Sequence, residues 1–182
     1  TMKKYVMYFC TTSSYVKSTL CFATADNIEG PYTYVDTILY SGYGKSNISE
    51  TNLYDVLGKN ADISRYLEYG GYNNKEWPNC IDPAIFTDAD GRMWMNYGSW
   101  SGGIFLLEID PTTGYPIYPV DDKDADPYYG YRLIGGGHHS AEGPYIQYDA
   151  ENGYYYLFVS YGDLQSDGGY QIRQFRSEKP TG

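Results

Sequence analysis

The stretch CIDPAIFTDADGRMWMNYGSWSGGIFLLEIDPTTG, residues 80–114, decides the fold. It holds three short apolar and aromatic runs at residues 81–87, 93–101 and 103–109, and the tetrapeptide DADG separates the first run from the second. Runs of this length, bounded by Gly, Asp and Ser, are typical of β-strands joined by tight turns. The stretch therefore predicts a leader strand followed by a β-hairpin.

The same unit recurs on both sides of this stretch. Downstream, residues 141–148 form a second leader strand, the turn-rich run DAENG follows, and a hairpin is predicted from residues 154–163 and 170–176. Upstream, residues 5–14 and 18–25 predict a hairpin that has no leader strand. A repeated unit of leader strand, turn and hairpin is typical of a β-propeller blade.

The fold class predicted from this repeat is all-β, a partial β-propeller with about three blades in one domain. Returning outer strands are expected at residues 32–39 and 131–134. A sandwich of the immunoglobulin or jelly-roll type is the competing all-β prediction, but it gives no reason for the leader strands to match each other. The predicted blades cover residues 1–41, 80–134 and 138–182.

Composition supports a β-rich domain and excludes two classes of partner. The 182 residues include 24 Tyr, 21 Gly and 9 Pro, which suit short strands punctuated by turns. Thirteen Lys and Arg against 23 Asp and Glu give a net charge of −10. This charge repels phosphate polymers and anionic lipids, so we expect neither nucleic acid nor a membrane surface as a partner.

Targeting signals are not expected within this chain. No apolar run reaches the length of a transmembrane helix, and the N-terminal residues lack the apolar centre of a signal peptide. A secreted or periplasmic parent protein and a cytoplasmic one both stay open. The chain is expected to be cut at both ends, because an outer strand is due where residues 179–182 end it.

Three cysteines, Cys10, Cys21 and Cys80, are an odd number without metal-binding spacing. Buried free thiols are the first interpretation, and a Cys10–Cys21 disulfide between neighbouring strands is the alternative. The long connection at residues 42–79 is expected to carry a short helix near residues 62–68.

Two carboxylates occupy matching places in the repeat. Asp82 and Glu142 lie near the start of successive leader strands, and Pro follows each of them closely. Because the first strand of each blade lines the central channel, we expect both side chains to meet at one channel mouth. Paired carboxylates repel each other as anions, so the one in drier surroundings keeps its proton to higher pH. Such a pair can act as a general acid and a charged residue that assists it. The tetrapeptide EGPY also begins at Glu29, where its context predicts an ordinary turn carboxylate at the rim.

Three stretches resemble glycoside hydrolase family 43, nearest to its arabinan-degrading members. They are residues 80–114, HHSAEGPYIQYDAENGYYYLFVSYG at 138–162 and GGYQIRQFRSEKPTG at 168–182. The resemblance implies a five-bladed propeller that hydrolyses glycosidic bonds with inversion, using three carboxylates. Glu142 matches the general acid, and Asp82 matches the residue that tunes and orients that acid. The general base would precede Thr1, and no residue of this sequence matches it.

The resemblance also extends to substrate-binding positions. Ser99 and Trp100 match the loop near the substrate, although a Trp there is also expected to pack between blades. Tyr161 ends the equivalent strand of the next blade, and His139 precedes the acid by three residues, where a solvated loop histidine is the alternative. We predict no metal or cofactor in this chain. In the family, a histidine of the last blade often binds a cation in the channel. This chain is expected to lack that blade, so such a cation is expected only in the full-length form.

The expected function is that of a glycoside hydrolase acting on arabinan or xylan of plant cell walls. Without its base, this chain alone is expected to be nearly inactive. A noncatalytic carbohydrate-binding or scaffold propeller is the alternative, and a lectin-like sandwich would place Asp82 and Glu142 far apart. We also hypothesise that the isolated chain self-associates through open blade faces.

Overall fold

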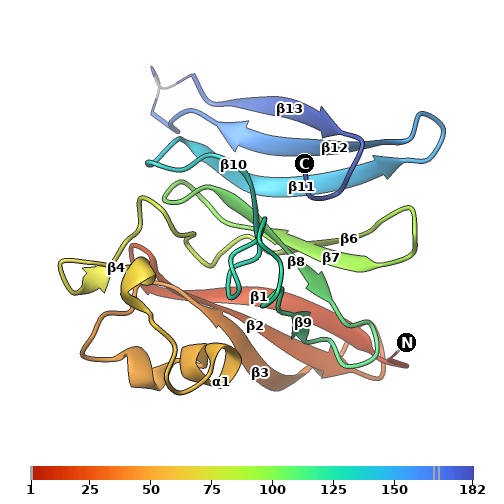
Figure 1. The fold of residues 1–182 in the computed structure, drawn as a ribbon. Helices are drawn as coiled ribbons and strands as arrows, with labels where there is room; N and C mark the ends of the chain where they lie inside the picture. The colour runs from red at the N-terminus through yellow and green to blue at the C-terminus, as the bar shows by residue number, and fades with distance from the viewer. Residues whose placement is uncertain (1, 166, 168) are drawn as a thin grey trace.

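A computed structural model describes residues 2–165, 167 and 169–182, so residues 1, 166 and 168 of the predicted blades lie outside the described residues. Within the described part, strands dominate and only one short α-helix and two 3-10 turns occur. Three sheets are stacked one over another along the chain, from the first sheet through the second to the third (Figure 1). The all-β prediction is confirmed.

The first sheet is a meander of three antiparallel strands, β1 (Tyr5–Ser14), β2 (Lys17–Ala25) and β3 (Thr33–Tyr40), in the order β1-β2-β3. The hairpin and its returning outer strand lie where the sequence predicts them, within one residue. No leader strand precedes β1 among the described residues, as expected.

The second sheet contains the leader strand, the hairpin and the outer strand predicted for a blade. Its order is β10-β8-β7-β6, and the short strand β9 pairs with β8 beyond this path. The bounds are β6 (Ala84–Thr87), β7 (Met93–Tyr97), β8 (Ile104–Ile109), β9 (Pro116–Ile117) and β10 (Tyr131–Ile134).

The third sheet is again a meander, β11 (Ala141–Asp149), β12 (Tyr154–Tyr161) and β13 (Gln171–Ser177), in the order β11-β12-β13. In the first and third sheets, and along β6, β7 and β8 of the second, strands that are neighbours in the sheet are also neighbours in the chain. The Greek-key connections of the competing sandwich prediction are therefore not found among the described strands.

The connection between the first and second sheets folds into small elements of its own. It contains a 3-10 turn (Ile48–Glu50), the helix α1 (Leu53–Leu57), a second 3-10 turn (Ser64–Tyr66) and the ribbon of β4 (Leu67–Glu68) with β5 (Gly71–Tyr72). The helix predicted near residues 62–68 is only a 3-10 turn, and the one α-helix of the described chain lies earlier.

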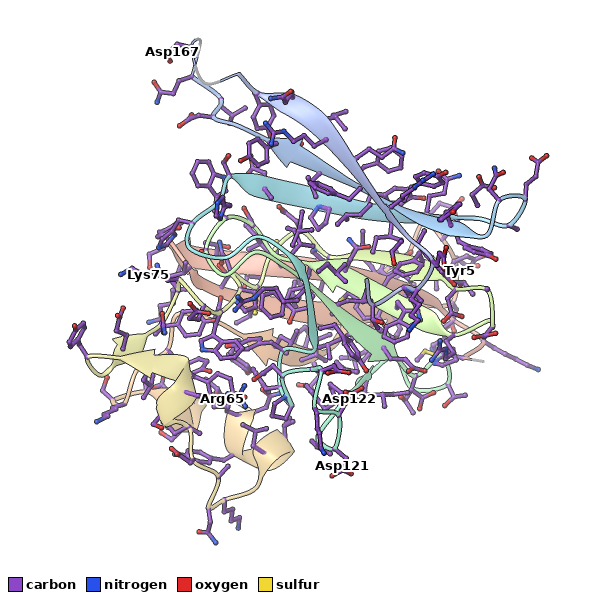
Figure 2. All side chains as sticks on the ribbon, turned by 45° about the horizontal axis from the view of Figure 1, so that its top comes forward. Tyr5, Arg65, Lys75, Asp121, Asp122 and Asp167 are labelled. Atoms are coloured by element: carbon purple, nitrogen blue, oxygen red, sulfur yellow. The ribbon has the colours of Figure 1, made fainter. Side chains whose placement is uncertain are left out.

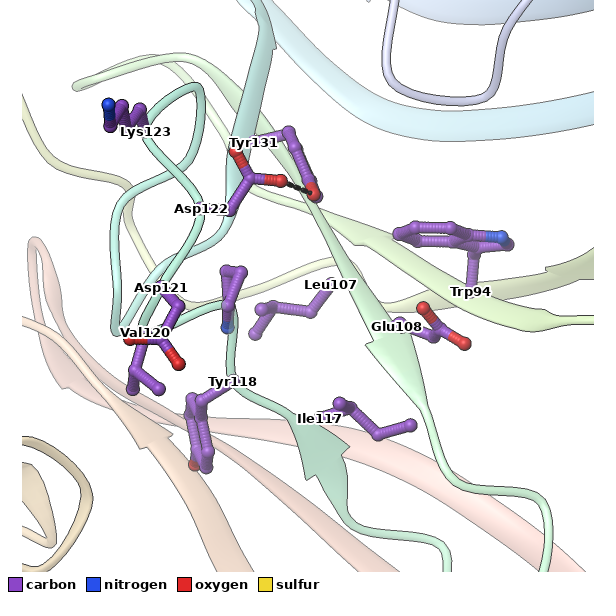
Figure 3. Close-up of a pocket in the computed structure, with 11 residues that line it drawn as sticks. Trp94, Leu107, Glu108, Ile117, Tyr118, Val120, Asp121, Asp122, Lys123 and Tyr131 are labelled. Carbon is purple, nitrogen blue, oxygen red and sulfur yellow. Dashed lines mark hydrogen bonds between the residues drawn. The ribbon is translucent and has the colours of Figure 1, made fainter.

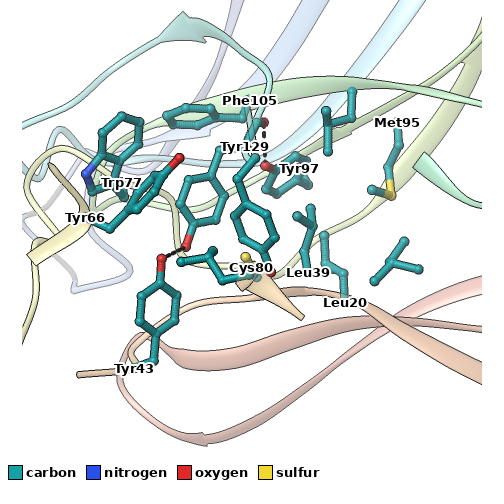
Figure 4. Close-up of a cluster of buried hydrophobic side chains, with 14 of the residues drawn as sticks. Leu20, Leu39, Tyr43, Tyr66, Trp77, Cys80, Met95, Tyr97, Phe105 and Tyr129 are labelled. Carbon is teal, nitrogen blue, oxygen red and sulfur yellow. Dashed lines mark hydrogen bonds between the residues drawn. The ribbon is translucent and has the colours of Figure 1, made fainter. Parts of the chain in front are cut away.

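Buried aromatic rings hold this connection against the first two sheets (Figure 4). Tyr66 packs its ring against Trp77 and Tyr129, with centroid distances of 5.1 and 5.6 Å. The hydroxyl of Tyr97 donates to the carbonyl oxygen of Tyr129 at 2.7 Å, so the buried phenol has a partner. Tyrosine at these core positions thus supplies apolar area and satisfies its own polar atom.

A buried carboxylate, Asp126, fastens the connection that precedes β10. It accepts hydrogen bonds from the backbone N–H groups of Tyr128 and Tyr129 at 3.0 and 2.7 Å. The Tyr66 hydroxyl donates to both of its oxygens at 3.1 Å, and the Arg65 guanidinium lies 3.2 Å away. Nearly every acceptor position of this side chain is therefore used inside the core.

A second core cluster joins the second and third sheets. It includes Phe86, Trp94 and Leu106 of the second sheet and Leu157 and Val159 of the third, all of them buried. This contact sets β11 against β6, which brings the two leader strands side by side as the propeller prediction requires.

The three cysteines are free. Cys10 pairs with Leu20 and Cys21 pairs with Phe9, so the two cysteines occupy successive register positions of the hairpin. Side chains at successive positions point to opposite faces of a sheet, so the alternative of a Cys10–Cys21 disulfide is wrong.

Among the residues that the structure describes, no helix combines the length and the apolar character needed to span a membrane.

Candidate active site

A β-bulge at the start of β11 presents Glu142. Glu142 pairs with Ser160, but the next paired residue on β11 is Tyr145, which faces Phe158, so the register shifts between them. Gly143 has a φ of 57°, in the left-handed region that glycine adopts without strain. Bulges turn a side chain away from the regular pleat, and this one explains why Gly and Pro follow Glu142.

Asp82 approaches Glu142 from the second sheet, as the repeat predicts. It lies two residues before β6, with a φ of 56°, and its Oδ2 accepts a hydrogen bond from the N–H of Gly143 at 3.2 Å. Both acids are half-buried. Burial raises the pKa of Asp82, the Gly143 N–H opposes that rise, and the nearby charge of Glu142 adds to it. Asp82 therefore holds its proton to higher pH than an ordinary Asp.

Because the pKa of Asp82 is raised in the folded state, the charged side chain costs stability. This cost is absent below the ordinary pKa of Asp, and it grows as the pH rises through the raised value. We expect Asp82→Asn to raise the melting temperature at pH 7, and we expect the gain to disappear at pH 3. Thermal unfolding monitored by circular dichroism at both pH values checks this. A variant less stable than the parent at pH 7 would contradict it.

Two hydroxyl groups from different sheets donate to Glu142. The Oγ of Ser99, a buried residue in the loop between β7 and β8, lies 3.3 Å from Oε2. The hydroxyl of Tyr170, immediately before β13, lies 2.8 Å from Oε1. The predicted residues Ser99, Asp82 and Glu142 are thus brought together, and Tyr170 joins them without having been predicted.

Trp100 is tied to the strand that carries Glu142. Its backbone N–H donates to the carbonyl oxygen of Ala141 at 2.8 Å, and its side chain is partly exposed. Trp100 and Ser101 have φ values of 46° and 40°. Residues other than glycine adopt such angles only where the surroundings impose them, and they gather at functional sites.

Tyr15, in the turn between β1 and β2, connects the first sheet to this region. Its hydroxyl lies 3.4 Å from the Oγ of Ser101 and 3.3 Å from the Nδ1 of His138. The N–H of His138 in turn donates to the Ser101 carbonyl oxygen at 2.9 Å. Loops of all three sheets therefore meet at one end of the leader strands, and the exposed Tyr15 ring offers an apolar face there.

His139 and Tyr161 lie in a different place. Together with Ile134 and Phe175 they line a cavity of about 210 Å³ between the second and third sheets. Tyr161 pairs with Ala141, one register position away from Glu142, so it faces the opposite side of the sheet. The guanidinium of Arg173 covers its ring at 3.5 Å. Substrate contact by these two residues stays a prediction.

A cavity of about 650 Å³ is lined by neither Asp82 nor Glu142 (Figure 3). It lies between β8 and the connection that precedes β10, and Asp122 accepts a hydrogen bond there from the hydroxyl of Tyr131. Asp121 and Asp122 sit at the end of the molecule opposite Asp167 of the β12–β13 connection (Figure 2). The chemistry of the carboxylate pair is thus separate from this cavity.

Tyr170 and Tyr15 are the residues of this region that the sequence did not single out. Both lie just outside a strand, and both reach a neighbouring sheet or strand through the hydroxyl. The sequence signal, an aromatic residue beside a turn, is shared with many other tyrosines of this chain.

In the described part of the chain, no group of three or more His, Cys, Asp or Glu side chains is placed to hold an ion.

Known proteins resemble this chain along nearly all of it. An extracellular endo-α-(1→5)-L-arabinanase of Thermotoga petrophila is 42% identical over 180 residues, which are 98% of this chain and 34% of the relative. The extracellular endo-α-(1→5)-L-arabinanase 2 of Bacillus subtilis is 42% identical over 181 residues, 98% of this chain and 33% of that protein. The chain spans about a third of the length of these relatives.

Solved structures agree with the fold. The glycoside hydrolase family 43 protein YxiA of Bacillus licheniformis superposes with a TM-score of 0.76 at 39% identity, covering 98% of this chain and 35% of that structure. The endo-1,5-α-L-arabinanase of Thermotoga petrophila gives the same TM-score at 41% identity, with coverages of 98% and 36%. The predicted fold, a five-bladed type of propeller with about three blades in this chain, is confirmed.

The family described as glycosyl hydrolases family 43 matches residues 39–182, most of the chain and both carboxylate strands. Together with the relatives and the fold, this match shows that the chain belongs to glycosyl hydrolase family 43.

Proposed function

We propose that the complete gene product containing this chain hydrolyses α-1,5-linked L-arabinan with inversion, outside the cell. The observation that carries the proposal is the Asp82–Glu142 pair, in which the residue after Glu142 donates to the Asp82 carboxylate. The choice of arabinan over xylan is supported by the names of two relatives, each 42% identical to this chain. Both names also describe an extracellular protein, which supports the location.

In this reaction Glu142 is the general acid. Its proton moves to the glycosidic oxygen while the bond from that oxygen to the anomeric carbon breaks, and Glu142 is left ionised. A water molecule gives one proton to the general base, attacks the anomeric carbon from the opposite face and yields a sugar of inverted configuration. The charge of Asp82 and the N–H of Gly143 orient the acid. Trp100 and Tyr15 offer aromatic faces for sugar rings.

The general base is proposed to lie outside residues 1–182. Inversion needs two carboxyl groups about 6.5–9.5 Å apart with the attacking water between them. Glu142 and Asp82 serve as acid and helper, so the base has to come from a further blade.

A direct assay tests the proposal. The complete gene product is incubated with linear arabinan and, separately, with xylan, and new reducing ends are counted. Release from arabinan, with a first product of inverted anomeric configuration by ¹H NMR, is expected. Binding of arabinan without any hydrolysis would favour the noncatalytic carbohydrate-binding alternative. Hydrolysis of xylan alone would overturn the choice of substrate.

Residues 1–182 expressed alone are expected to release no reducing ends above the background without enzyme. The physical reason is that no group in this segment is proposed to activate water. The same arabinan assay, run on residues 1–182 and on the complete gene product at equal concentration, measures the difference. Circular dichroism confirms that the short form is folded. Comparable rates for the two forms would place the base within residues 1–182.

A further inference from the structure

Tyr170 and Glu142 lie on the same face of the third sheet. Glu142 pairs with Ser160, and Ser160 pairs with Ile172, so these three residues form one row across the sheet. Paired residues of antiparallel strands share a face, and so do residues two apart along a strand. Tyr170 precedes Ile172 by two residues and therefore lies on the same face, nearer to the end where the loops meet.

The contact between Tyr170 and Glu142 crosses a whole strand. Strand β12 lies between β11 and β13, and strands two places apart in a sheet are separated by roughly 9.5 Å. Only a long side chain bridges that gap. The Tyr170 hydroxyl does so and donates to Oε1 of Glu142 at 2.8 Å, a normal length for a hydrogen bond from a hydroxyl to a carboxylate.

The segment before Tyr170 is held beside the acid strand. The N–H of Gly162 lies 3.1 Å from the Oγ of Ser140, two residues before Glu142. Asp163 forms a bridge with Gly169, the residue immediately before Tyr170. These contacts fix both ends of the connection, so the Tyr170 ring is presented to Glu142 by backbone that the acid strand itself supports.

The two oxygens of Glu142 are held unequally. Tyr170 holds Oε1 at 2.8 Å, whereas the Ser99 Oγ lies 3.3 Å from Oε2, a longer and weaker contact. A glycosidic oxygen can displace the weaker contact at a smaller cost. We propose that Tyr170 is a positioning residue that anchors Oε1 of Glu142, so that Oε2 carries the proton delivered to the leaving group. The proton transfer rests on the proposed function.

The substitution Tyr170→Phe removes only the hydroxyl. Because a misplaced catalytic group costs up to about a hundredfold in rate, we expect kcat on arabinan to fall about ten- to a hundredfold. KM should change little, since Tyr170 contacts the acid. An aryl arabinoside with a good leaving group should lose much less activity.

The matched control is Tyr145→Phe, an exposed tyrosine three residues after Glu142. Both variants are made in the complete gene product. A loss of kcat on arabinan that is confined to Tyr170→Phe, and that is much smaller on the aryl arabinoside, supports the positioning role. Equal kinetics for the two variants on both substrates would overturn the role and leave the proposed hydrolase function intact.

A second measurement does not depend on hydrolysis. With ¹³C-labelled tyrosine at pH 7, the ring Cζ signal of Tyr170 should differ between the parent protein and Glu142→Gln, because the hydroxyl loses its charged acceptor, and the Cζ signal of Tyr145 should change much less. An unchanged Tyr170 signal would overturn the contact and the inference, whatever the activity. A changed signal in a protein that hydrolyses no arabinoside would overturn the proposed function, and with it the proton transfer.

Discussion

Replacing Glu142 with Gln is expected to lower the rate of arabinan hydrolysis by about 10²–10⁴-fold in the complete gene product, the range that a general acid contributes. Gln has the shape of Glu but no proton to give to the leaving oxygen. The Tyr170 hydroxyl can still donate to its amide oxygen, and its amide NH2 can donate to the Oγ of Ser99, so the fold should be unaffected. Initial rates from reducing ends measure the effect.

Substrates with different leaving groups distinguish the loss of the general acid from the loss of the fold. An aryl arabinoside whose phenol ionises readily needs little protonation, so Glu142→Gln should retain most of its activity on that substrate. The matched control is Glu29→Gln, because Glu29 opens the other copy of the tetrapeptide EGPY and is exposed in the turn after β2. A rate on arabinan equal to that of the parent would remove Glu142 from its catalytic role.

Replacing Asp126 with Ala is expected to lower the free energy of unfolding by about 3 kcal/mol or more. The substitution leaves the N–H groups of Tyr128 and Tyr129 and the hydroxyl of Tyr66 buried without their acceptor. Each orphaned buried donor costs about 1–3 kcal/mol, and the Arg65 charge loses its partner as well. Urea unfolding, followed by fluorescence and analysed with a common slope, measures the difference.

Two further variants make the Asp126 experiment specific. Tyr66→Phe removes one donor and keeps the carboxylate, so its cost should be only about 1 kcal/mol. Asp121→Ala alters an exposed carboxylate of the same connection and should stay within about 0.5 kcal/mol of the parent. A loss below 1 kcal/mol for Asp126→Ala would show that these donors find water or other partners.

Most strands could be predicted because their signals are local. The outer strand β10 has the predicted bounds, since its apolar run is short and glycines flank it. The leader strand of the second sheet begins three residues later than predicted. Asp82 adopts a left-handed backbone conformation and Pro83 has no N–H to donate, so pairing starts at Ala84.

The remaining features depend on contacts between segments far apart in the sequence. The acid pair could be predicted, because the repeat itself relates Asp82 to Glu142. Tyr170 could not, because its role depends on the register of β13 against β12 and of β12 against β11. The role of Asp126 could not be predicted either, because its hydrogen-bond donor Tyr66 is 60 residues away in the chain. The helix α1 has five residues, too few for a clear periodic pattern.

The left-handed backbone at Asp82, Trp100, Ser101 and His138 limits how substrate preference can be engineered. Each such residue costs about 1–2 kcal/mol, and branched side chains such as Val, Ile and Thr cost more. The residues present already carry this cost, so unbranched replacements add little to it, and libraries at these four codons should leave out Val, Ile and Thr. Full diversity is better placed at Tyr15, whose backbone is free of this constraint.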